Sequence, residues 1–121
     1  MLVREGETRP WGRYEVLTEE SSYKVKTITV NPGQRLSYQR HRRRSEHWFV
    51  VEGTGLVTLD DATRDVAPGS TVDVAVGTAH RIQNTGSVPL IFVEVQRGAY
   101  LGEDDIERLS DDYGRADPAD A

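Results

Sequence analysis

Four polar side chains on two separate segments have the types and the spacing of a metal site. They are Gln39, His41, Glu46 and His80. On an extended strand, Gln39 and His41 project to the same face. After a short bend over residues 42–45, Glu46 begins the next strand and can return its carboxylate to that face. His80 directly follows a glycine-containing turn, where a neighbouring strand begins. If these strands are adjacent, an amide oxygen, two imidazoles and a carboxylate converge.

These donors are borderline-to-hard ligands, which suit a divalent ion such as zinc, manganese, cobalt, nickel or iron. Four protein ligands leave a position open on a metal that takes five or six, and such a metal acts as a Lewis acid on a substrate oxygen. For each residue alone the alternative is ordinary, because a histidine near a strand end commonly packs in the core or faces solvent. The pattern of four predicts the metal site, but it does not select the metal.

The segments that carry these residues follow an all-β pattern. Short apolar stretches alternate with polar ones, and Gly, Pro, Asn and Asp punctuate them, which is typical of a sandwich or barrel. The predicted strands span residues 12–17, 23–30, 36–41, 46–51, 55–60, 63–66, 70–74, 79–84 and 89–96. Residues 102–113 predict a short C-terminal helix with an acidic first turn, which suits the helix dipole. The first ten residues are either loose or an edge strand.

Length and composition limit the class of protein. The 121 residues suffice for one domain, with a core over about residues 9–115 and a tail at 116–121. The absence of cysteine excludes disulfides, thiolate zinc sites and a cysteine nucleophile. No apolar run approaches a membrane span, and no signal-peptide core precedes the domain, so we expect a cytoplasmic protein with no membrane partner. The net charge of -5 argues against a nucleic-acid partner.

Two motifs around the four residues resemble those of the cupin superfamily. They are Gly33-x5-Gln39-x-His41-x4-Glu46-x6-Gly53 and Gly69-x5-Ala75-x-Gly77-x2-His80-x3-Asn84. The usual superfamily residues at positions 39 and 75 are histidine and proline, so Gln39 and Ala75 are departures. The resemblance implies a double-stranded β-helix, the cupin jelly roll. Because cupins often pair through their sheets, it also implies a homodimer.

The sequence is more similar to one branch, the type II mannose-6-phosphate isomerase domain, in which glutamine at the first ligand position is the norm. The motifs include Arg9-Pro-Trp-Gly-Arg-Tyr14, Gln39-x-His-x-x-Arg-x-Glu-His-Trp48, Gly98-x-Tyr-Leu-Gly-Glu-Asp-Asp-Ile106 and Asp112-Tyr-Gly-Arg115. This resemblance implies a metal-dependent isomerase that interconverts mannose 6-phosphate and fructose 6-phosphate for polysaccharide synthesis. The domain is often fused behind a mannose-1-phosphate guanylyltransferase domain, for which 121 residues leave no room.

Aldose–ketose isomerisation through a cis-enediol requires a base, an electrophile and an anchor for the phosphate. Arginine suits the phosphate because its fork makes paired, charge-assisted hydrogen bonds. Arg44 is the first choice for a catalytic and substrate-binding arginine, because we expect it in the loop between two ligand segments and the family motif has arginine there. Arg81, next to His80, is the second choice for binding substrate.

Lys24 and Lys26 share strand parity with Ile28 and Val30. If that face is interior, both lysines point into the barrel, where they can bind phosphate or, for Lys26, act as the base. The alternative is that both lie near the mouth of the barrel and reach water.

Glu94 and Gln96 share one strand face with Leu90 and Phe92, from which they can position substrate hydroxyls or support the metal ligands. The opposite face of that strand is also apolar, so parity alone leaves its orientation open. Two other functions fit the same residues. One is a sugar-phosphate-binding module without turnover. The other is a metal-dependent oxygenase, against which Gln39 argues, because iron oxygenases among the cupins generally use three histidines and a glutamate.

Overall fold

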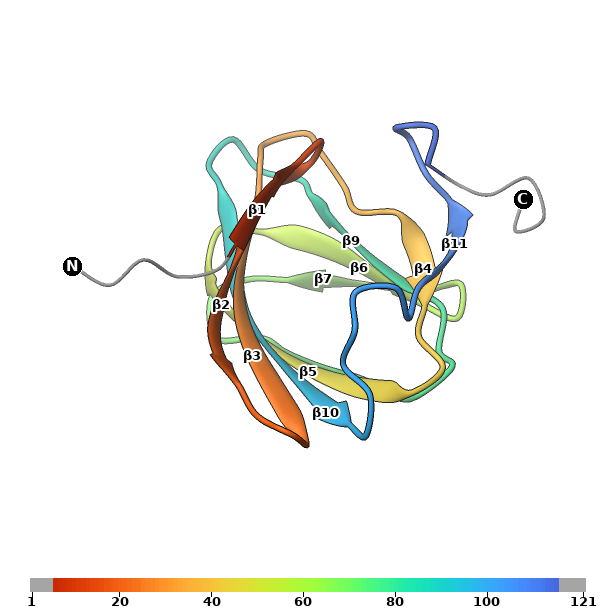
Figure 1. The fold of residues 1–121 in the computed structure, drawn as a ribbon. Coiled ribbons are helices and arrows are strands. Elements are labelled where there is room, and N and C mark those ends of the chain that lie inside the picture. The colour runs from red at the N-terminus through yellow and green to blue at the C-terminus, as the bar shows by residue number, and fades with distance from the viewer. Residues whose placement is uncertain (1–5, 116–121) are drawn as a thin grey trace.

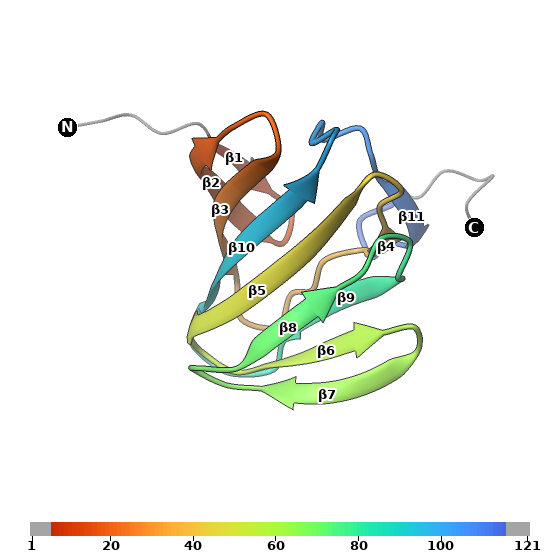
Figure 2. The same ribbon diagram turned by 90° about the horizontal axis from the view of Figure 1, so that it is seen from below.

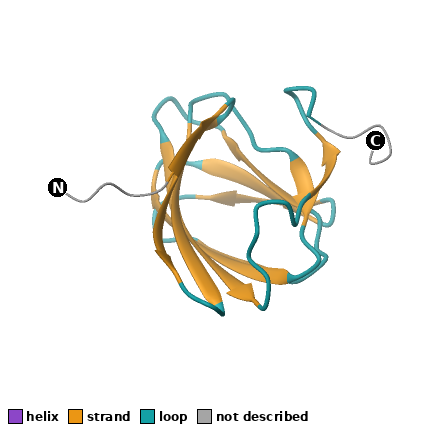
Figure 3. Ribbon diagram, viewed as in Figure 1, coloured by secondary structure: helices purple, strands orange, loops and turns teal. Residues whose placement is uncertain are grey.

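The computed structural model describes residues 6–115 of the chain, and every regular element in that range is a β-strand (Figure 3). The strands are β1 (Gly6–Arg9), β2 (Gly12–Glu19), β3 (Tyr23–Val30), β4 (Tyr38–Arg40), β5 (Arg44–Glu52), β6 (Gly55–Leu59), β7 (Ala62–Val66), β8 (Thr71–Val74), β9 (His80–Asn84), β10 (Leu90–Gly98) and β11 (Glu107–Ser110). The all-β prediction is therefore confirmed. Between residues 6 and 115 there is no helix long and apolar enough to cross a membrane.

The strands form two antiparallel sheets that face each other across the core (Figure 1). One sheet has the order β1-β2-β3-β10-β5-β8, and the other has the order β11-β4-β9-β6-β7. Figure 2 shows them as two layers, with β10, β5 and β8 side by side. The connection over residues 99–106 leaves the first sheet after β10 and reaches the edge of the second sheet at β11. This is the double-stranded β-helix that the resemblance implies.

The interior of the barrel changes from apolar to polar along its length, because the inward-facing residues of the strands change from apolar to polar. On β10 the inward residues are Leu90 and Phe92, followed by Glu94 and Gln96, and all four are buried. On β3 the buried residues run in the opposite sense, from Lys24 and Lys26 to Ile28 and Val30. Since β3 and β10 are antiparallel neighbours, their polar ends coincide. The core is apolar at one end of the barrel and polar at the other, which is where a site can form.

The predicted helix over residues 102–113 is wrong. Residues 107–110 form β11, which pairs with β4 at the edge of the second sheet. The acidic side chain of Glu107 accepts hydrogen bonds from Arg40 at 2.6 Å and from Arg42 at 2.9 Å. Short isolated helices are marginal in water, so backbone pairing with β4 and these ion pairs outweigh the local helical preference.

Two boundaries near the site also differ from the prediction. β5 begins at Arg44, so Arg44 is the first residue of a strand and does not lie in a loop. Residues 6–9 form the edge strand β1, paired with β2, which is one of the two alternatives predicted for the first ten residues, whereas residues 1–5 lie outside the described range. The predicted tail over residues 116–121 lies outside the described residues.

Candidate metal centre

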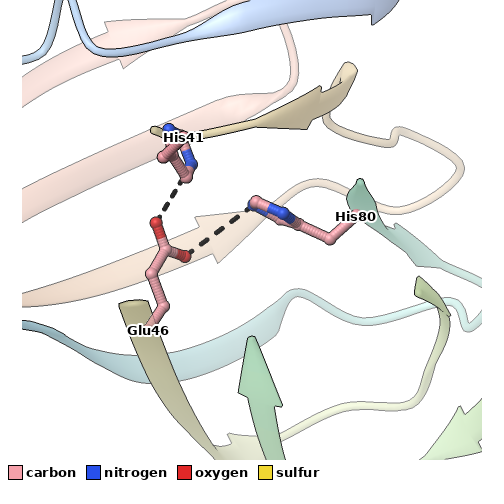
Figure 4. Close-up of side chains that lie close together, drawn as sticks. All are labelled: His41, Glu46 and His80. Carbon is pink, nitrogen blue, oxygen red and sulfur yellow. Dashed lines mark ion pairs between the residues drawn. The ribbon is translucent and has the colours of Figure 1, made fainter. Parts of the chain in front are cut away.

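His41, Glu46 and His80 converge from both sheets and point toward one another (Figure 4). Glu46 lies on β5 of the first sheet, whereas His80 begins β9 and His41 follows β4 in the second. Nε2 of His41 lies 3.0 Å from Oε2 of Glu46, and Nε2 of His80 lies 3.9 Å from Oε1. All three residues are buried, and their potential ligand atoms lie within 4.8 Å of one another.

Backbone carbonyls fix the orientation of both imidazoles. Nδ1 of His41 lies 2.6 Å from the carbonyl oxygen of Asp105, and Nδ1 of His80 lies 2.9 Å from that of Thr78. A carbonyl only accepts hydrogen bonds, so Nδ1 of each ring carries a proton, and Nε2 of each ring is the nitrogen directed toward Glu46. Metal-binding histidines are commonly held in this way. Within residues 6–115, Nε2 of His80 is buried and has no hydrogen-bond partner, which leaves its lone pair available.

The electrostatics favour the protonation states that a divalent ion needs. Burial is the main cause that lowers the pKa of His80, the charge of Glu46 acts in the opposite direction, and the charges of His41 and Arg44 lower it further. Burial alone would raise the pKa of Glu46, but its hydrogen bond with His41 and the charges of His80 and Arg44 hold that pKa well below its usual value. A neutral imidazole and an ionised carboxylate are the forms that bind metal.

Gln39 lies in the same region of the inner wall. Its backbone pairs with His80 across β4 and β9, and its side chain is buried in the wall of the cavity that also includes His41. Its amide oxygen is a suitable fourth donor. Two imidazole nitrogens, a carboxylate and an amide oxygen therefore fit a divalent ion of the zinc, manganese, cobalt, nickel or iron type.

Arg44 and Trp48 both hold the carboxylate of Glu46. Nε of Arg44 donates to Oε2 of Glu46 over 2.9 Å, and Nη2 of Arg44 lies 3.2 Å from Nε2 of His41. Nε1 of Trp48 donates to Oε1 of Glu46 over 2.9 Å. The contribution of Trp48 was not predicted, although the strand parity that it shares with Glu46 is a signal for it. Every oxygen of Glu46 thus has a fixed direction.

A cavity between the sheets adjoins this group. Its wall includes the predicted residues Lys26, Gln39, His41, Arg44 and Glu94. It also includes Glu103 and three arginines that sequence reasoning did not assign to the site, namely Arg9, Arg108 and Arg115. Arg9 and Arg115 stand within the motifs that carry the family resemblance, which was the available signal.

Both lysines of β3 point inward and are buried, so they do not reach water at the mouth of the barrel. Lys26 is buried, pairs with Glu103 and lies 4.3 Å from the centre of the Tyr14 ring. Nζ of Lys24 donates to the carbonyl oxygen of Leu101 over 2.9 Å and lies 3.4 Å from Oε1 of Glu103. Lys26 is part of the cavity wall, whereas Lys24 ties down the connection between β10 and β11.

Glu94 and Gln96 also face inward. Burial is the main cause that raises the pKa of Glu94 to about 7, and the charge of Glu46 adds to it. Arg44 and Lys26 act in the opposite direction. The amide of Gln96 donates to the Glu94 carboxylate, and Gln96 itself is fully buried. Glu94 is therefore a carboxyl group in the cavity wall that exchanges its proton near neutral pH.

The structure does not bring Arg81 to the cavity. It follows His80 on β9, so its side chain takes the opposite direction, where Nε donates to the carbonyl oxygen of Leu36 over 3.1 Å. His47 likewise points away from the group, and its Nδ1 lies 2.6 Å from Oδ1 of Asp73 on β8.

Comparisons with known proteins identify the family of the chain. The family model described as mannose-6-phosphate isomerase C-terminal matches residues 3–111. The alginate biosynthesis protein AlgA of Pseudomonas aeruginosa is 51% identical over 112 residues, which are 92% of this chain and 23% of that protein. The mannose-1-phosphate guanylyltransferase of Escherichia coli is 44% identical, over 88% of this chain and 22% of that protein. The chain thus spans less than a quarter of the length of these relatives.

Solved structures share the fold at lower identity. The capsular polysaccharide assembling protein CapF of Staphylococcus aureus matches with a TM-score of 0.77 and 18% identity, over 91% of this chain and 32% of that one. A Klebsiella pneumoniae protein with a double-stranded β-helix domain matches with a TM-score of 0.70 and 22% identity, over 78% and 80%. By sequence, the chain belongs to the mannose-6-phosphate isomerase C-terminal family, and its fold is a double-stranded β-helix.

Proposed function

We propose that the chain is a metal-dependent isomerase that interconverts mannose 6-phosphate and fructose 6-phosphate. The observation that carries the proposal is the buried group of His41, Glu46 and His80 beside a cavity whose wall contains Glu94, in a chain of this family. The names of the relatives, which refer to alginate biosynthesis and to mannose-1-phosphate, support a role in polysaccharide synthesis.

Gln39, His41, Glu46 and His80 are the residues that would hold the divalent ion. When bound, the ion would supply Lewis-acid polarisation of a substrate oxygen. Arg44 and Trp48 orient the carboxylate of Glu46 through their hydrogen bonds, and the carbonyls of Asp105 and Thr78 orient the imidazoles.

Glu94 is the residue that we assign to proton transfer. Its ionised carboxylate would take the proton from C2 of the open-chain aldose, which leaves a cis-enediolate. The hydroxyl proton of O2 would pass to O1, and Glu94 would return its proton to C1 on the same face. A group that moves a proton efficiently in both directions has a pKa near the working pH. The raised pKa of Glu94, about 7, meets this condition.

Cationic side chains surround Glu94. Lys26 lies opposite Glu94 in the register of β3 and β10, and Arg44 lies in the same wall. Their charges would stabilise the negative charge that develops on the substrate oxygens. We therefore assign this electrostatic role to Lys26 in place of the role of base that the sequence suggested. Gln96 would fix the Glu94 carboxyl group, and Lys24 would hold the connection that closes this side of the cavity.

The test starts from mannose 6-phosphate. Coupling enzymes convert the fructose 6-phosphate that forms into glucose 6-phosphate and then oxidise it, and the assay follows the reduced nicotinamide cofactor that this oxidation produces. The metal-loaded full chain should turn over, and in deuterium oxide the product should carry solvent deuterium at C1, because Glu94 exchanges its proton. Glu94→Gln should lose activity by at least a hundredfold. Binding of mannose 6-phosphate without turnover would reject the enzyme in favour of a binding module.

A further inference from the structure

Lys26 and Glu103 form an ion pair in the wall of the cavity that Glu94 also lines. Lys26 comes from β3, whereas Glu103 comes from the connection between β10 and β11, which Figure 1 draws in blue. Nζ of Lys26 donates a hydrogen bond to Oε1 of Glu103. In the register of β3 and β10, Lys26 lies opposite Glu94. The pair therefore adjoins the residue that we assign to proton transfer between C2 and C1.

The surroundings keep the two groups of the pair oppositely charged. Burial alone would raise the pKa of Glu103, but the charge and the hydrogen bond of Lys26, together with the charge of Lys24, hold that pKa below its usual value. Nζ of Lys26 also lies 4.3 Å from the centre of the Tyr14 ring, and the face of an aromatic ring attracts a cation. The pair is thus a carboxylate in direct contact with an ammonium group, which are a proton acceptor and a proton donor.

One oxygen of the Glu103 carboxylate is not used by the pair. Lys26 and Lys24 both contact Oε1, and the distance from Lys24 is 3.4 Å. Among residues 6–115, Oε2 of Glu103 has no hydrogen-bond partner. The Glu103 side chain is 43% exposed, whereas that of Lys26 is only 5% exposed. The carboxylate therefore has an oxygen that can accept a proton from a molecule in the cavity.

The proposed substrate requires a proton transfer besides the one at carbon. Mannose 6-phosphate carries its phosphate on O6, so its 5-hydroxyl is free and adds to the C1 aldehyde to close a six-membered hemiacetal. The open chain on which Glu94 acts is therefore the minor form in solution. Opening the ring takes a base at the hydroxyl on C1 and an acid at O5. These two oxygens are bonded to the same carbon, so an acid and a base in direct contact suit them.

We propose that the pair of Lys26 and Glu103 opens the pyranose ring of the sugar phosphate, so that the chain also catalyses exchange between its α and β anomers. The Glu103 carboxylate takes the proton of the C1 hydroxyl, and the electron pair of that O–H bond becomes the second bond of C1=O1. The C1–O5 bond breaks, and its electron pair takes a proton from Nζ of Lys26 to form the 5-hydroxyl. The proton on Glu103 then passes to Lys26, which restores both groups. Reclosure on the other face of C1 gives the other anomer.

This inference rests on the proposed function for the identity of the substrate, but it does not rest on the chemistry at carbon. Glu94 acts only on the open chain, so a variant without a proton acceptor at this position should still open the ring. Ring opening and isomerisation therefore have separate readouts, and the failure of one can be told from the failure of the other.

The experiment measures anomer exchange in mannose 6-phosphate labelled with carbon-13 at C1, by magnetisation transfer between the C1 signals of the two anomers in NMR spectra. The metal-loaded full chain is compared with Glu94→Gln, Glu103→Gln and Lys26→Arg. Arginine keeps the positive charge and can pair with Glu103, but it does not release its proton. Lys26→Arg thus separates transfer of a proton from a purely electrostatic role.

Two variants outside the cavity wall serve as matched controls. Glu52→Gln makes the same change as Glu103→Gln at the exposed end of β5. Arg64→Lys makes the reverse exchange to Lys26→Arg on the surface, where Arg64 donates to the carbonyl oxygen of Thr71. Both controls should exchange the anomers as fast as wild type.

Wild type and Glu94→Gln should both exchange the anomers faster than buffer alone, although Glu94→Gln loses isomerisation. Lys26→Arg and Glu103→Gln should each lower the protein-dependent exchange about a hundredfold, as expected for the loss of a general acid or base. Exchange at the wild-type rate in either variant would overturn the inference. If Lys26→Arg fails to fold, Glu103→Gln applies the same test at a partly exposed side chain.

The behaviour of wild type separates the two proposals. Isomerisation of mannose 6-phosphate without faster anomer exchange would overturn the ring-opening pair and leave the isomerase standing. Faster anomer exchange without formation of fructose 6-phosphate would refute the isomerase and leave the ring-opening pair standing. A wild type that does neither would refute both.

Discussion

The guanidinium of Arg44 and the carboxylate of Glu46 form a buried ion pair, in which Nε donates to Oε2 over 2.9 Å. The side chains are only 6% and 2% exposed. Arg44 therefore compensates the charge of Glu46 when no metal is present. The carboxylate oxygen and the His41 nitrogen that Arg44 contacts are also the atoms expected to bind the ion, so the arginine and the ion share partners.

Replacing Arg44 with methionine should destabilise the metal-free protein strongly. Loss of one partner from a buried pair leaves an uncompensated charge, which costs about 3–5 kcal/mol. Urea unfolding with a chelator present measures this loss, and Arg64→Met is the matched control. Added zinc or manganese should restore more stability to Arg44→Met than to wild type, because the ion compensates Glu46. Equal stabilisation of both proteins would contradict the shared-partner interpretation.

His80→Ala should remove bound metal and activity together. The substitution deletes a buried Nε2 that has no hydrogen-bond partner among the described residues and is therefore available to the ion. Metal content after dialysis should fall from stoichiometric to near none, as measured by elemental analysis. His47→Ala is the control, because the His47 side chain points away from the metal group toward Asp73. This variant should retain its metal. Full metal content in His80→Ala would show that the three residues do not form the site.

Glu94 should make the metal-free protein less stable as the pH rises. Its folded-state pKa is raised from 4.5 to about 7, so its ionisation is disfavoured in the folded state. The stability is full below pH 4.5, falls between pH 4.5 and 7, and is constant above that range. The total effect is of the order of 3 kcal/mol. Glu94→Gln should lack this loss, and unfolding free energies at pH 5 and pH 8 should therefore differ less than in wild type.

Glu107 should have the opposite pH dependence. Hydrogen bonds from Arg40 and Arg42 lower its pKa from 4.5 to about 2, so the pairs stabilise the fold above pH 4.5 and are lost as the pH falls toward 2. Glu107→Gln should melt at a lower temperature than wild type at pH 7, and the difference should shrink below pH 4.5. Glu52→Gln, on the exposed end of β5, should show no such pattern.

Strand parity explains how much of the site was predictable. It places Gln39 on the same strand face as His41, and Lys24 on the same strand face as Lys26. On those strands the residues that share a face can be told apart from the sequence. Strand parity fails on β10, where Ile91, Val93 and Val95 make the outer face as apolar as the inner one. Only the pairing of β10 with both β3 and β5 decides that Glu94 faces inward.

The C-terminal segment was beyond local reasoning for a different reason. Its acidic residues favour a helix when considered alone, but their partners lie about sixty residues away on β4 and in the turn after it. Asp105 accepts hydrogen bonds from the backbone nitrogens of Arg42 and Arg43, and Glu107 pairs with Arg40 and Arg42. Contacts at such separation leave no periodic signal in the sequence.

The connection between β10 and β11 links the cavity to the metal ligands mechanically. It supplies the carbonyl of Asp105 to His41, the carbonyl of Leu101 to Lys24 and the carboxylate of Glu103 to Lys26. A displacement of this connection that admits a sugar would also withdraw the carbonyl oxygen of Asp105, which orients the His41 ring. If the site binds an ion and a sugar phosphate as we propose, uptake of the substrate and retention of the ion would be coupled, and the ion should exchange most slowly while this connection stays in place.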